Sequence, residues 1–250
     1  MIVPVINNSE LKYIQSFAHK KHWTEESVFI VEGPKMLEEL LASEWVIRKI
    51  LALPDWIQAQ GSLPAEVVEV DEIMLGRLSL LQTPNKVMAI VEKKKETAVT
   101  DFKNISTLLL DGIQDPGNLG TIIRTADWFG IKQIIVSADT AGWYNPKVIQ
   151  STMGSCFRVN LHSMELETLL QTNAKSVNKL PVYGALLNGK SMHEIKWEPA
   201  NFILIGNESK GIRENLMPFI SHPISIPRIG EAESLNAAVA TGIILSHFKS

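Results

Sequence analysis

Three short polar segments, each close behind an apolar run, carry the residue types of this sequence that could do chemistry. They span residues 111–124, 206–211 and 226–236. In a parallel sheet, ligands bind beyond the carboxyl ends of the strands, so polar groups that follow apolar strands are candidates for one shared site. A guanidinium and a carboxylate supply opposite charges there, while amide and hydroxyl groups supply hydrogen bonds. The candidate side chains are Asn118, Arg124, Glu208, Ser234 and Asn236.

The first segment leads into a predicted helix over residues 118–129. Asn118 is a suitable N-cap for that helix, and Gly120 in its first turn would permit close approach by another backbone or a ligand. The apolar residues of the helix predict a buried face, and Arg124 lies off that face. Taken alone, an arginine in such a position is typical of a surface salt bridge.

The second segment places Glu208 between Gly206 and Gly211, directly after an apolar run. A plain turn, with Gly211 chosen for its backbone freedom, is the simplest interpretation. A phosphate-binding loop is disfavoured because the glycine-rich order that ends in Gly-Lys-Ser or Gly-Lys-Thr is absent.

The third segment ends where Ser234 predicts the N-cap of a last helix that begins at Leu235 and is almost free of charge. A helix that is apolar on nearly every side must be buried, either in its own core or in a subunit interface. A capped core helix explains Ser234 and Leu235, but it does not explain why Asn236 follows them.

The rest of the chain alternates strand-like and helix-like segments, which predicts the α/β class. Charged residues at 92–97 interrupt this pattern; a solvated linker and an RNA-contacting basic patch both fit them. A boundary there divides the chain into domains 1–97 and 98–250. Strands separated by helices in the second domain predict a parallel sheet covered on both faces. The predicted strands are 28–32, 45–53, 67–70, 86–91, 107–110, 133–136, 157–161, 182–186, 202–205 and 223–227, and a short helix is predicted at 211–217.

Taken together, the three polar segments resemble the motifs of the SpoU family of RNA 2′-O-ribose methyltransferases, within the knotted SPOUT class. The resemblance covers roughly residues 105–250. Ser209-Lys210 and Ala237-Ala238 depart from the family's commoner residues, and neither change removes a group that the reaction needs. The first domain, with Phe29-Ile30-Val31-Glu32-Gly33-Pro34, looks more loosely like the L30e-type substrate-binding domain. The matching motifs are Asn118-x-Gly120-x-x-x-Arg124, Gly206-x-Glu208-x-x-Gly211, and Ile226-Pro227-x-x-Gly230-x-x-x-Ser234-Leu235-Asn236.

The resemblance implies a fold and a reaction. The fold would be a C-terminal parallel-sheet SPOUT domain tied in a trefoil knot, behind a smaller L30e-like α/β domain. The reaction would transfer the methyl group of S-adenosyl-L-methionine to a ribose 2′-hydroxyl. Arg124 would stabilise the oxyanion, since a guanidinium resists deprotonation. Asn118 and Glu208 would orient Arg124 and the ribose, and Ser234 and Asn236 would fix the knotted loop. The cofactor would be held at Leu186, Gly206, Ile226 and Leu235.

The resemblance also implies partners: RNA, with ribosomal RNA ahead of transfer RNA, and a second copy of the chain, since such enzymes are typically homodimers. No metal is needed, and the six histidines show no ligand spacing. RNA-contacting residues would be Lys12, Lys20, Lys21, Lys35, Arg158, Lys210, Arg213 and Arg228, with Trp23 and Trp143 as stacking surfaces. Three alternatives stay open: a non-catalytic RNA-binding protein of this fold, a Rossmann-type nucleotide enzyme (whose GxGxxG order is absent), and methylation of a base.

Composition limits these choices only loosely. The chain has 250 residues, 45% of them hydrophobic and 20% charged, as is ordinary for a globular protein. It contains no apolar stretch long enough to span a membrane and no signal-peptide pattern. The single cysteine, Cys156, fits a reducing cytoplasm and is expected to be a small buried residue. A net charge of −3 argues mildly against nucleic acid, yet a local basic patch can exist within it.

Overall fold

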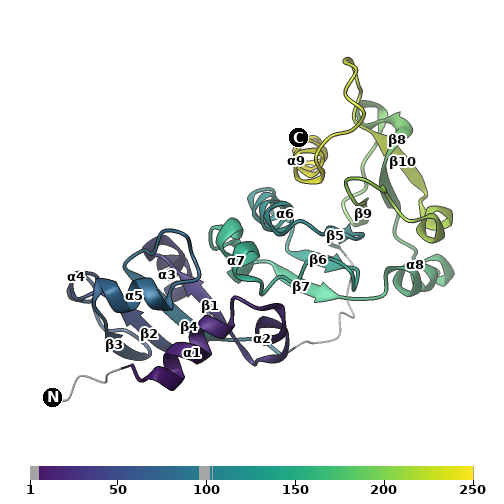
Figure 1. Ribbon diagram of the computed structural model, residues 1–250. Coiled ribbons are helices and arrows are strands. Elements are labelled where there is room, and N and C mark those ends of the chain that lie inside the picture. The colour runs from purple at the N-terminus through teal and green to yellow at the C-terminus, as the bar shows by residue number, and fades with distance from the viewer. Residues whose placement is uncertain (1–5, 96–101, 103, 250) are drawn as a thin grey trace. The chain divides into compact units, whose positions relative to one another are not determined.

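The computed structural model describes residues 6–95, 102 and 104–249. The chain divides into two compact units, each drawn in Figure 1. Unit 1 comprises residues 1–95 and 144–157, and unit 2 comprises residues 96–143 and 158–250. The predicted boundary between residues 97 and 98 lies outside the described residues. The segment 144–157, which the sequence places in the second domain, packs within unit 1.

Unit 1 is built on a four-stranded mixed sheet in the order β1-β4-β2-β3. Strand β4 runs antiparallel to both β1 and β2, and β2 runs parallel to β3. All five residues of β1 are buried, so this strand has apolar neighbours on both faces. The strands are β1 (Val28–Glu32), β2 (Ile47–Ala52), β3 (Glu66–Glu69) and β4 (Val87–Glu92).

Five helices belong to the N-terminal part of this unit. Asp71 caps α5, since its side-chain oxygen accepts from Met74 N at 2.7 Å. Two short helices, α2 and α4, were not predicted, because six and five residues are too few to show a helical period. The helices are α1 (Asn8–Ser16), α2 (Lys20–Glu25), α3 (Pro34–Leu41), α4 (Pro54–Gln58) and α5 (Glu72–Leu78).

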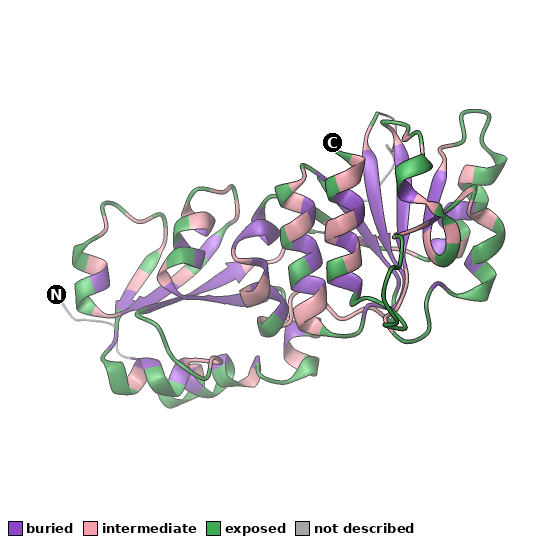
Figure 2. Cartoon of the chain, turned by 90° about the horizontal axis from the view of Figure 1, so that it is seen from above, coloured by how far each residue is buried: buried purple, intermediate pink, exposed green. Residues whose placement is uncertain are grey.

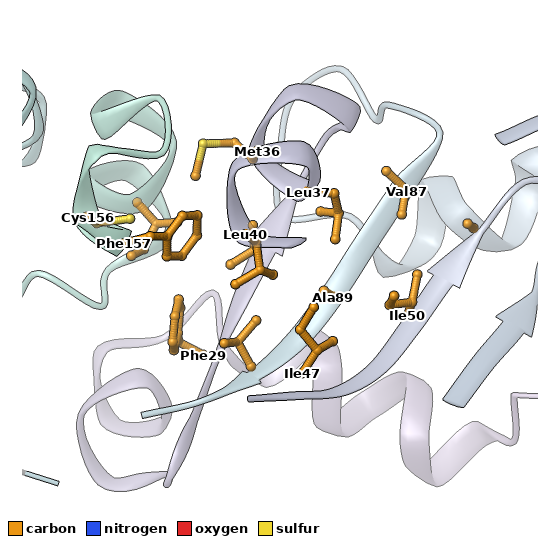
Figure 3. Packing of buried hydrophobic residues seen from close by; sticks show 14 of the residues in the cluster. Phe29, Met36, Leu37, Leu40, Ile47, Ile50, Val87, Ala89, Cys156 and Phe157 are labelled. Carbon is orange, nitrogen blue, oxygen red and sulfur yellow. The ribbon is translucent and has the colours of Figure 1, made fainter. Parts of the chain in front are cut away.

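Helix α7 (Pro146–Thr152) and the short 3-10 helix η1 (Ser155–Phe157) complete the core of unit 1. Figure 3 shows Phe157 and Cys156 beside Phe29 and the α3 residue Leu40. Trp45 joins them, with its ring centroid 5.5 Å from that of Phe29 and 6.0 Å from that of Phe157. Its indole N–H also donates to the Phe157 carbonyl oxygen at 3.3 Å. The prediction that Cys156 is a buried apolar residue is confirmed.

Two lysines of the predicted linker contact residues of unit 1. The Lys93 ammonium donates to the Trp23 carbonyl oxygen at 2.9 Å and lies 4.8 Å from the centroid of the Tyr144 ring. Burial lowers its pKa. Lys94 lies 4.6 Å from the centroid of the Trp45 ring. The solvated-linker prediction is therefore wrong at Lys93, which is half-buried, whereas Lys94 is exposed as that prediction expects.

Unit 2 is built on a six-stranded sheet in the order β10-β8-β9-β5-β6-β7, and every strand pair in it is parallel. The predicted parallel sheet is confirmed. Strands β5, β6 and β9 are buried at every residue, whereas β7 is partly buried and exposed. Figure 2 shows buried strands in purple and exposed loops in green. The strands are β5 (Ser106–Leu110), β6 (Gln133–Val136), β7 (Asn160–Ser163), β8 (Val182–Ser191), β9 (Asn201–Ile205) and β10 (His222–Ser225); the α-helices are α6 (Pro116–Trp128), α8 (Leu166–Lys175) and α9 (Ala237–Phe248).

Two predicted elements are displaced. The strand predicted at 157–161 begins instead at Asn160, because Phe157 lies in a 3-10 turn and packs into the core of unit 1. The helix predicted at 211–217 is a 3-10 helix, η3 (Glu214–Phe219). Gly211 cannot start it because its φ is +69° and it is hydrogen-bonded back to Asn207 in a tight loop.

Strands β8 and β10 pair with a large jump in register. Tyr183 and Gly184 pair with His222 and Pro223, whereas the next pairs join Ile224 to Lys190 and Ser225 to Ser191. Residues 185–189 therefore leave the ladder. A Cβ atom at Gly189 would collide with the backbone of Ile224, so only glycine fits at the point where the strands rejoin.

Within the part of the chain that the structure describes, no helix is long and apolar enough to cross a lipid bilayer.

Candidate active site

The first two polar segments meet because the strands before them, β5 and β9, are neighbours in the sheet. The loop after β9 is closed by a pair of backbone hydrogen bonds between Asn207 and Gly211, of 2.9 and 3.0 Å. The Asn207 side-chain amide then donates to the Gly112 carbonyl oxygen at 2.7 Å. The two loops are thus held together at the carboxyl edge of the sheet.

Helix α6 starts two residues before the predicted start. Its N-cap is Asp115, whose carboxylate accepts from Asn118 N at 2.8 Å, and Pro116 occupies the first helical position. The prediction that Asn118 caps this helix is therefore wrong. Proline at this position has no N–H to leave unsatisfied, and its fixed φ suits a helix start. The Asn118 side chain is consequently available for contacts outside the helix.

The N-cap of α9 was also misplaced. Asn236 is the cap, and its side-chain oxygen accepts from Ala238 N at 2.9 Å and from Val239 N at 3.3 Å. Ser234, the predicted cap, lies exposed two residues earlier. This cap explains why an asparagine stands at the start of an otherwise apolar helix.

One hydrogen-bonded chain joins all three polar segments. The Asn236 amide nitrogen donates to the Asn118 side-chain oxygen at 2.9 Å, and the Asn118 amide nitrogen donates to Glu208 Oε1 at 2.6 Å. Each amide thereby has a fixed orientation. Among residues 6–95, 102 and 104–249, no hydrogen bond to the second carboxylate oxygen of Glu208 is found. That oxygen is available to a ligand.

Arg124 stands apart from this chain of bonds. It is exposed on α6, and the apolar face that buries the helix includes Ile122, Ile123 and Ala126, as predicted. Its guanidinium makes no hydrogen bond or ion pair with the described part of the chain. Trp128, one turn further along the helix, is 84% exposed. Hydrogen bonds therefore join Asn118, Glu208 and Asn236, and none links Arg124 to them within the described residues of one chain.

The four predicted cofactor residues lie on three separate elements. Leu186 is half-buried on β8 where the strand leaves its ladder, and it packs against the core cluster that contains Ile212. Gly206 has no room for a Cβ atom because the backbone of residues 211–212 lies against it. Ile226 is half-buried, and Leu235 is 44% exposed.

The loop between β10 and α9 is rich in unused backbone groups. Residues 227–235 make no backbone–backbone hydrogen bond with any described residue, and the Ala232 carbonyl oxygen accepts only a long 3.4 Å bond from Arg228. Backbone N–H and C=O groups are strong hydrogen-bonding groups. A loop that leaves so many of them unpaired can bind a neutral polar ligand through its backbone.

Sequence reasoning missed a charged cluster beside these loops. Asp111, 1% exposed, accepts bonds from the backbone and side chain of Arg213, whose guanidinium also lies 3.8 Å from Asp139. The hydroxyl of Ser137, which donates to Asp139, lowers the pKa of that carboxyl. The available signal was an aspartate placed directly after an apolar strand. Both carboxylates engage the Arg213 guanidinium, and its RNA contact stays a prediction.

Two further predictions can be compared with the structure. Trp23, a predicted stacking surface, is 9% exposed in the core of unit 1 and cannot stack on a base. No group of three or more His, Cys, Asp or Glu side chains that could hold a metal ion is found among the described residues.

The fold and the joined loops define an α/β protein with a candidate ligand site at the carboxyl edge of a parallel sheet. A family model described as the SpoU rRNA Methylase family matches residues 106–246. A second model, described as an MRM3-like substrate binding domain, matches residues 8–89. The chain belongs to the SpoU rRNA methylase family, as the resemblance of its motifs predicts.

Similar proteins match over nearly the whole chain. The 23S rRNA (guanosine(2553)-2′-O)-methyltransferase RlmP of Bacillus subtilis is 31% identical over 97% of this chain and 96% of its own length. A solved structure from Porphyromonas gingivalis, titled as a putative RNA methyltransferase of the TrmH family, has a TM-score of 0.87 at 34% identity over 98% of both chains. An AdoMet-bound rRNA methyltransferase from Sinorhizobium meliloti has a TM-score of 0.83 at 28% identity, over 99% of this chain and 96% of that one.

Proposed function

We propose that this protein transfers the methyl group of S-adenosyl-L-methionine to a ribose 2′-hydroxyl of ribosomal RNA. The observation that carries this proposal is the hydrogen-bonded chain from Asn236 through Asn118 to Glu208, which joins the three motif segments of a SpoU family member. The relatives favour ribosomal over transfer RNA, since RlmP and RlmB proteins are both named as 23S rRNA 2′-O-methyltransferases.

The cofactor would be bound chiefly by backbone. The unpaired groups of residues 227–235 suit an uncharged adenine, with Gly206, Ile226 and Leu235 placing the backbone against it and Leu186 giving an apolar side. When bound, S-adenosyl-L-methionine supplies an electrophilic methyl carbon. The related Sinorhizobium meliloti structure is titled as AdoMet-bound.

The residues of this chain prepare the nucleophile. They would act on the ribose hydroxyl, and methyl transfer to its oxygen would leave the electron pair of the broken carbon–sulfur bond on the cofactor's sulfur. Arg124 stabilises the negative charge on the ribose oxygen, and the hydroxyl proton leaves to phosphate or water. Glu208 and Asn118 orient the ribose and the guanidinium. Asn236 positions Asn118, because its amide oxygen caps α9 and its amide nitrogen donates to Asn118. The exposed Ser234 can contact a substrate phosphate.

The finer architecture belongs to the same proposal. Strand β10 is at one edge of the sheet and β5 lies inside it. Helix α9, which follows β10, nevertheless returns to pack against α6, which follows β5 (Figure 1). This return supports a trefoil knot in the C-terminal chain. Unit 1 would be the L30e-like RNA-binding part, in line with the substrate-binding model matched at residues 8–89. The functional division is 1–97 and 98–250, and the cytoplasm is the proposed location.

A homodimer would complete the site. The exposed faces of α6 and α9 carry Trp128, 84% exposed, and Val239, 51% exposed, on helices that pack together. Large apolar side chains exposed in this way mark an interaction surface. A second copy that covers them would bring its own Arg124 toward the Asn118–Glu208 pair.

The experiment incubates the protein with radiolabelled S-adenosyl-L-methionine and an unmodified 23S rRNA transcript, with an unmodified tRNA transcript alongside. We expect label in the rRNA, at a ribose that resists alkaline cleavage. Arg124→Ala should lower the rate by at least about 100-fold, the scale for loss of one oxyanion-stabilising donor. Label in the tRNA transcript alone would identify transfer RNA, not ribosomal RNA, as the substrate. No label in either RNA would favour the non-catalytic alternative.

Mixed subunits test the dimer. Neither Arg124→Ala nor Asn118→Ala homodimers should be active, but a heterodimer of the two contains one intact site if Arg124 acts across the interface. Co-expression with two different affinity tags yields this heterodimer. An inactive heterodimer would show that Arg124 and Asn118 act within one chain.

A further inference from the structure

We propose that Arg213, held by the buried Asp111, is a positioning residue that fixes Glu208 in the active site. This inference rests on the proposed methyl transfer and adds to it a residue outside the three motifs. Glu208 lies on the loop after β9 and is itself hydrogen-bonded to Asn118. Among the residues that the structure describes, only two other side-chain contacts tie this loop to the segment between β5 and α6.

The first anchor precedes Glu208. The Asn207 side-chain oxygen accepts from Ser209 N at 2.9 Å and Lys210 N at 3.1 Å, and its amide nitrogen donates to the Gly112 carbonyl oxygen at 2.7 Å. This anchor shapes the turn in which Glu208 sits. It does not fix the far end of the loop.

The second anchor is the Asp111–Arg213 pair. Asp111 Oδ2 accepts from Arg213 N at 2.8 Å, while Oδ1 accepts from Arg213 Nε at 2.6 Å and lies 2.5 Å from Nη2. One residue thus occupies both oxygens of a carboxylate that is 1% exposed. Such a buried charge must keep its partner, so the end of the Glu208 loop is tied to the end of β5.

The same guanidinium reaches a third loop. Arg213 Nη1 lies 3.8 Å from Asp139, which follows β6 and accepts from the Ser137 hydroxyl at 2.7 Å. Gly112 N donates to that same hydroxyl at 2.8 Å. Arg213 therefore links the loops after β9, β5 and β6, three adjacent strands. A guanidinium fork can hold this geometry, whereas an ammonium makes only point contacts.

The test compares Arg213→Ala with wild type as full-length protein on the unmodified 23S rRNA transcript. We expect kcat to fall about 100-fold, the scale for a catalytic group displaced by about 1 Å. KM for the transcript should stay within about threefold, because the wild-type guanidinium is engaged by protein carboxylates. A raised KM with unchanged kcat would instead make Arg213 an RNA contact and overturn the proposal.

Coupling to Glu208 separates positioning from loss of folding. The double variant Arg213→Ala/Glu208→Gln should be no slower than Glu208→Gln alone, since a mispositioned group and a removed group are the same defect. A double variant whose loss of rate equals the product of the two single losses would overturn the proposal. If the alanine variant does not fold, Arg213→Lys, which keeps the charge, replaces it in the same comparison. Arg48→Ala is the control, because it also removes a direct arginine–carboxylate bond, Arg48 to Glu92 at 2.8 Å, in unit 1.

Hydrogen exchange gives a readout that needs no methyl transfer. In Arg213→Ala, amides of residues 206–212 should exchange faster while those of β5 and β9 keep their protection. Unchanged exchange in the loop would overturn the proposal even where wild type methylates the transcript. A wild type that does not methylate the transcript would instead refute the proposed function. Amide exchange of residues 206–212 would then decide whether Arg213 positions the Glu208 loop.

Discussion

Each unit buries one carboxylate at the end of a strand, and the two are satisfied in opposite ways. Glu32, the last residue of β1, is 5% exposed and accepts bonds from the Ser79 hydroxyl at 2.5 Å and Leu80 N at 2.8 Å. Burial raises its pKa. Asp111, just after β5, is 1% exposed and is held by the charged Arg213.

The two kinds of hydrogen-bond donor, neutral for Glu32 and charged for Asp111, give the two carboxylates different structural roles. Glu32 is bound only by neutral donors in the part of unit 1 that the structure describes, so it can take up a proton without leaving a buried cation alone. Its role is to anchor the chain after α5. Asp111 is instead bound by a cation, and replacing it with a neutral residue would release Arg213 and with it the loop that carries Glu208. Unit 1 therefore depends mainly on apolar packing, whereas the site edge of unit 2 depends on a charge pair.

The largest expected effect tests the packing side of this comparison. Phe29→Ala removes a fully buried ring that contacts Trp45 and Tyr144, and should lower the free energy of unfolding of unit 1 by about 3–5 kcal/mol. Urea titration followed by hydrogen exchange would resolve unit 1 from unit 2. Ile73→Ala, at a side chain 78% exposed, is the control and should change stability by less than about 0.5 kcal/mol. A Phe29→Ala loss below 1 kcal/mol would contradict the packing argument.

The next effect tests the charge pair. Asp111→Asn keeps the shape but leaves Arg213 without its anion, and should destabilise unit 2 by about 2–3 kcal/mol in the same titration. Glu92→Gln, which breaks the exposed pair with Arg48, should cost less than about 1 kcal/mol. Equal losses in the two variants would remove the distinction between a buried and an exposed pair.

The smallest effect concerns Glu32 and its pH dependence. A carboxyl with a raised folded-state pKa contributes stability that is present below its unfolded pKa and is lost as pH rises through the folded value. The stability advantage of wild type over Glu32→Gln should thus be greatest at low pH and shrink by about 1 kcal/mol or less toward pH 7. Thermal melts of both proteins across that range measure it. An advantage that grows with pH would mean that the buried carboxylate prefers its charged form.

Much of the fold was predictable because its signals are local. Strands β5, β6 and β9 are short, mostly apolar runs, and their alternation with helices predicted the parallel sheet of unit 2. The helix caps were less predictable, since Asp115 and Asn118 are both good caps. Pro116 was the deciding signal, because proline favours the first helical position.

The rest depended on contacts between residues far apart in the sequence. Arg213 and Asp111 are 102 positions apart, and nothing near either one specifies the other. Asn118 accepts from Asn236 and donates to Glu208 across 118 and 90 positions, so the motifs predicted a shared site but not its hydrogen bonds. The shift of β7 has the same cause, because Phe157 finds its partners in Phe29 and Trp45.

The placement of residues 144–157 has a consequence for the integrity of the protein. These residues supply Ile149, Cys156 and Phe157 to the core of unit 1, yet they are covalently continuous on both sides with unit 2. A protease site engineered between residues 95 and 104 would therefore produce two fragments that stay associated under native conditions. The first fragment alone would lack part of its own interior, much as a split protein lacks its complementing peptide.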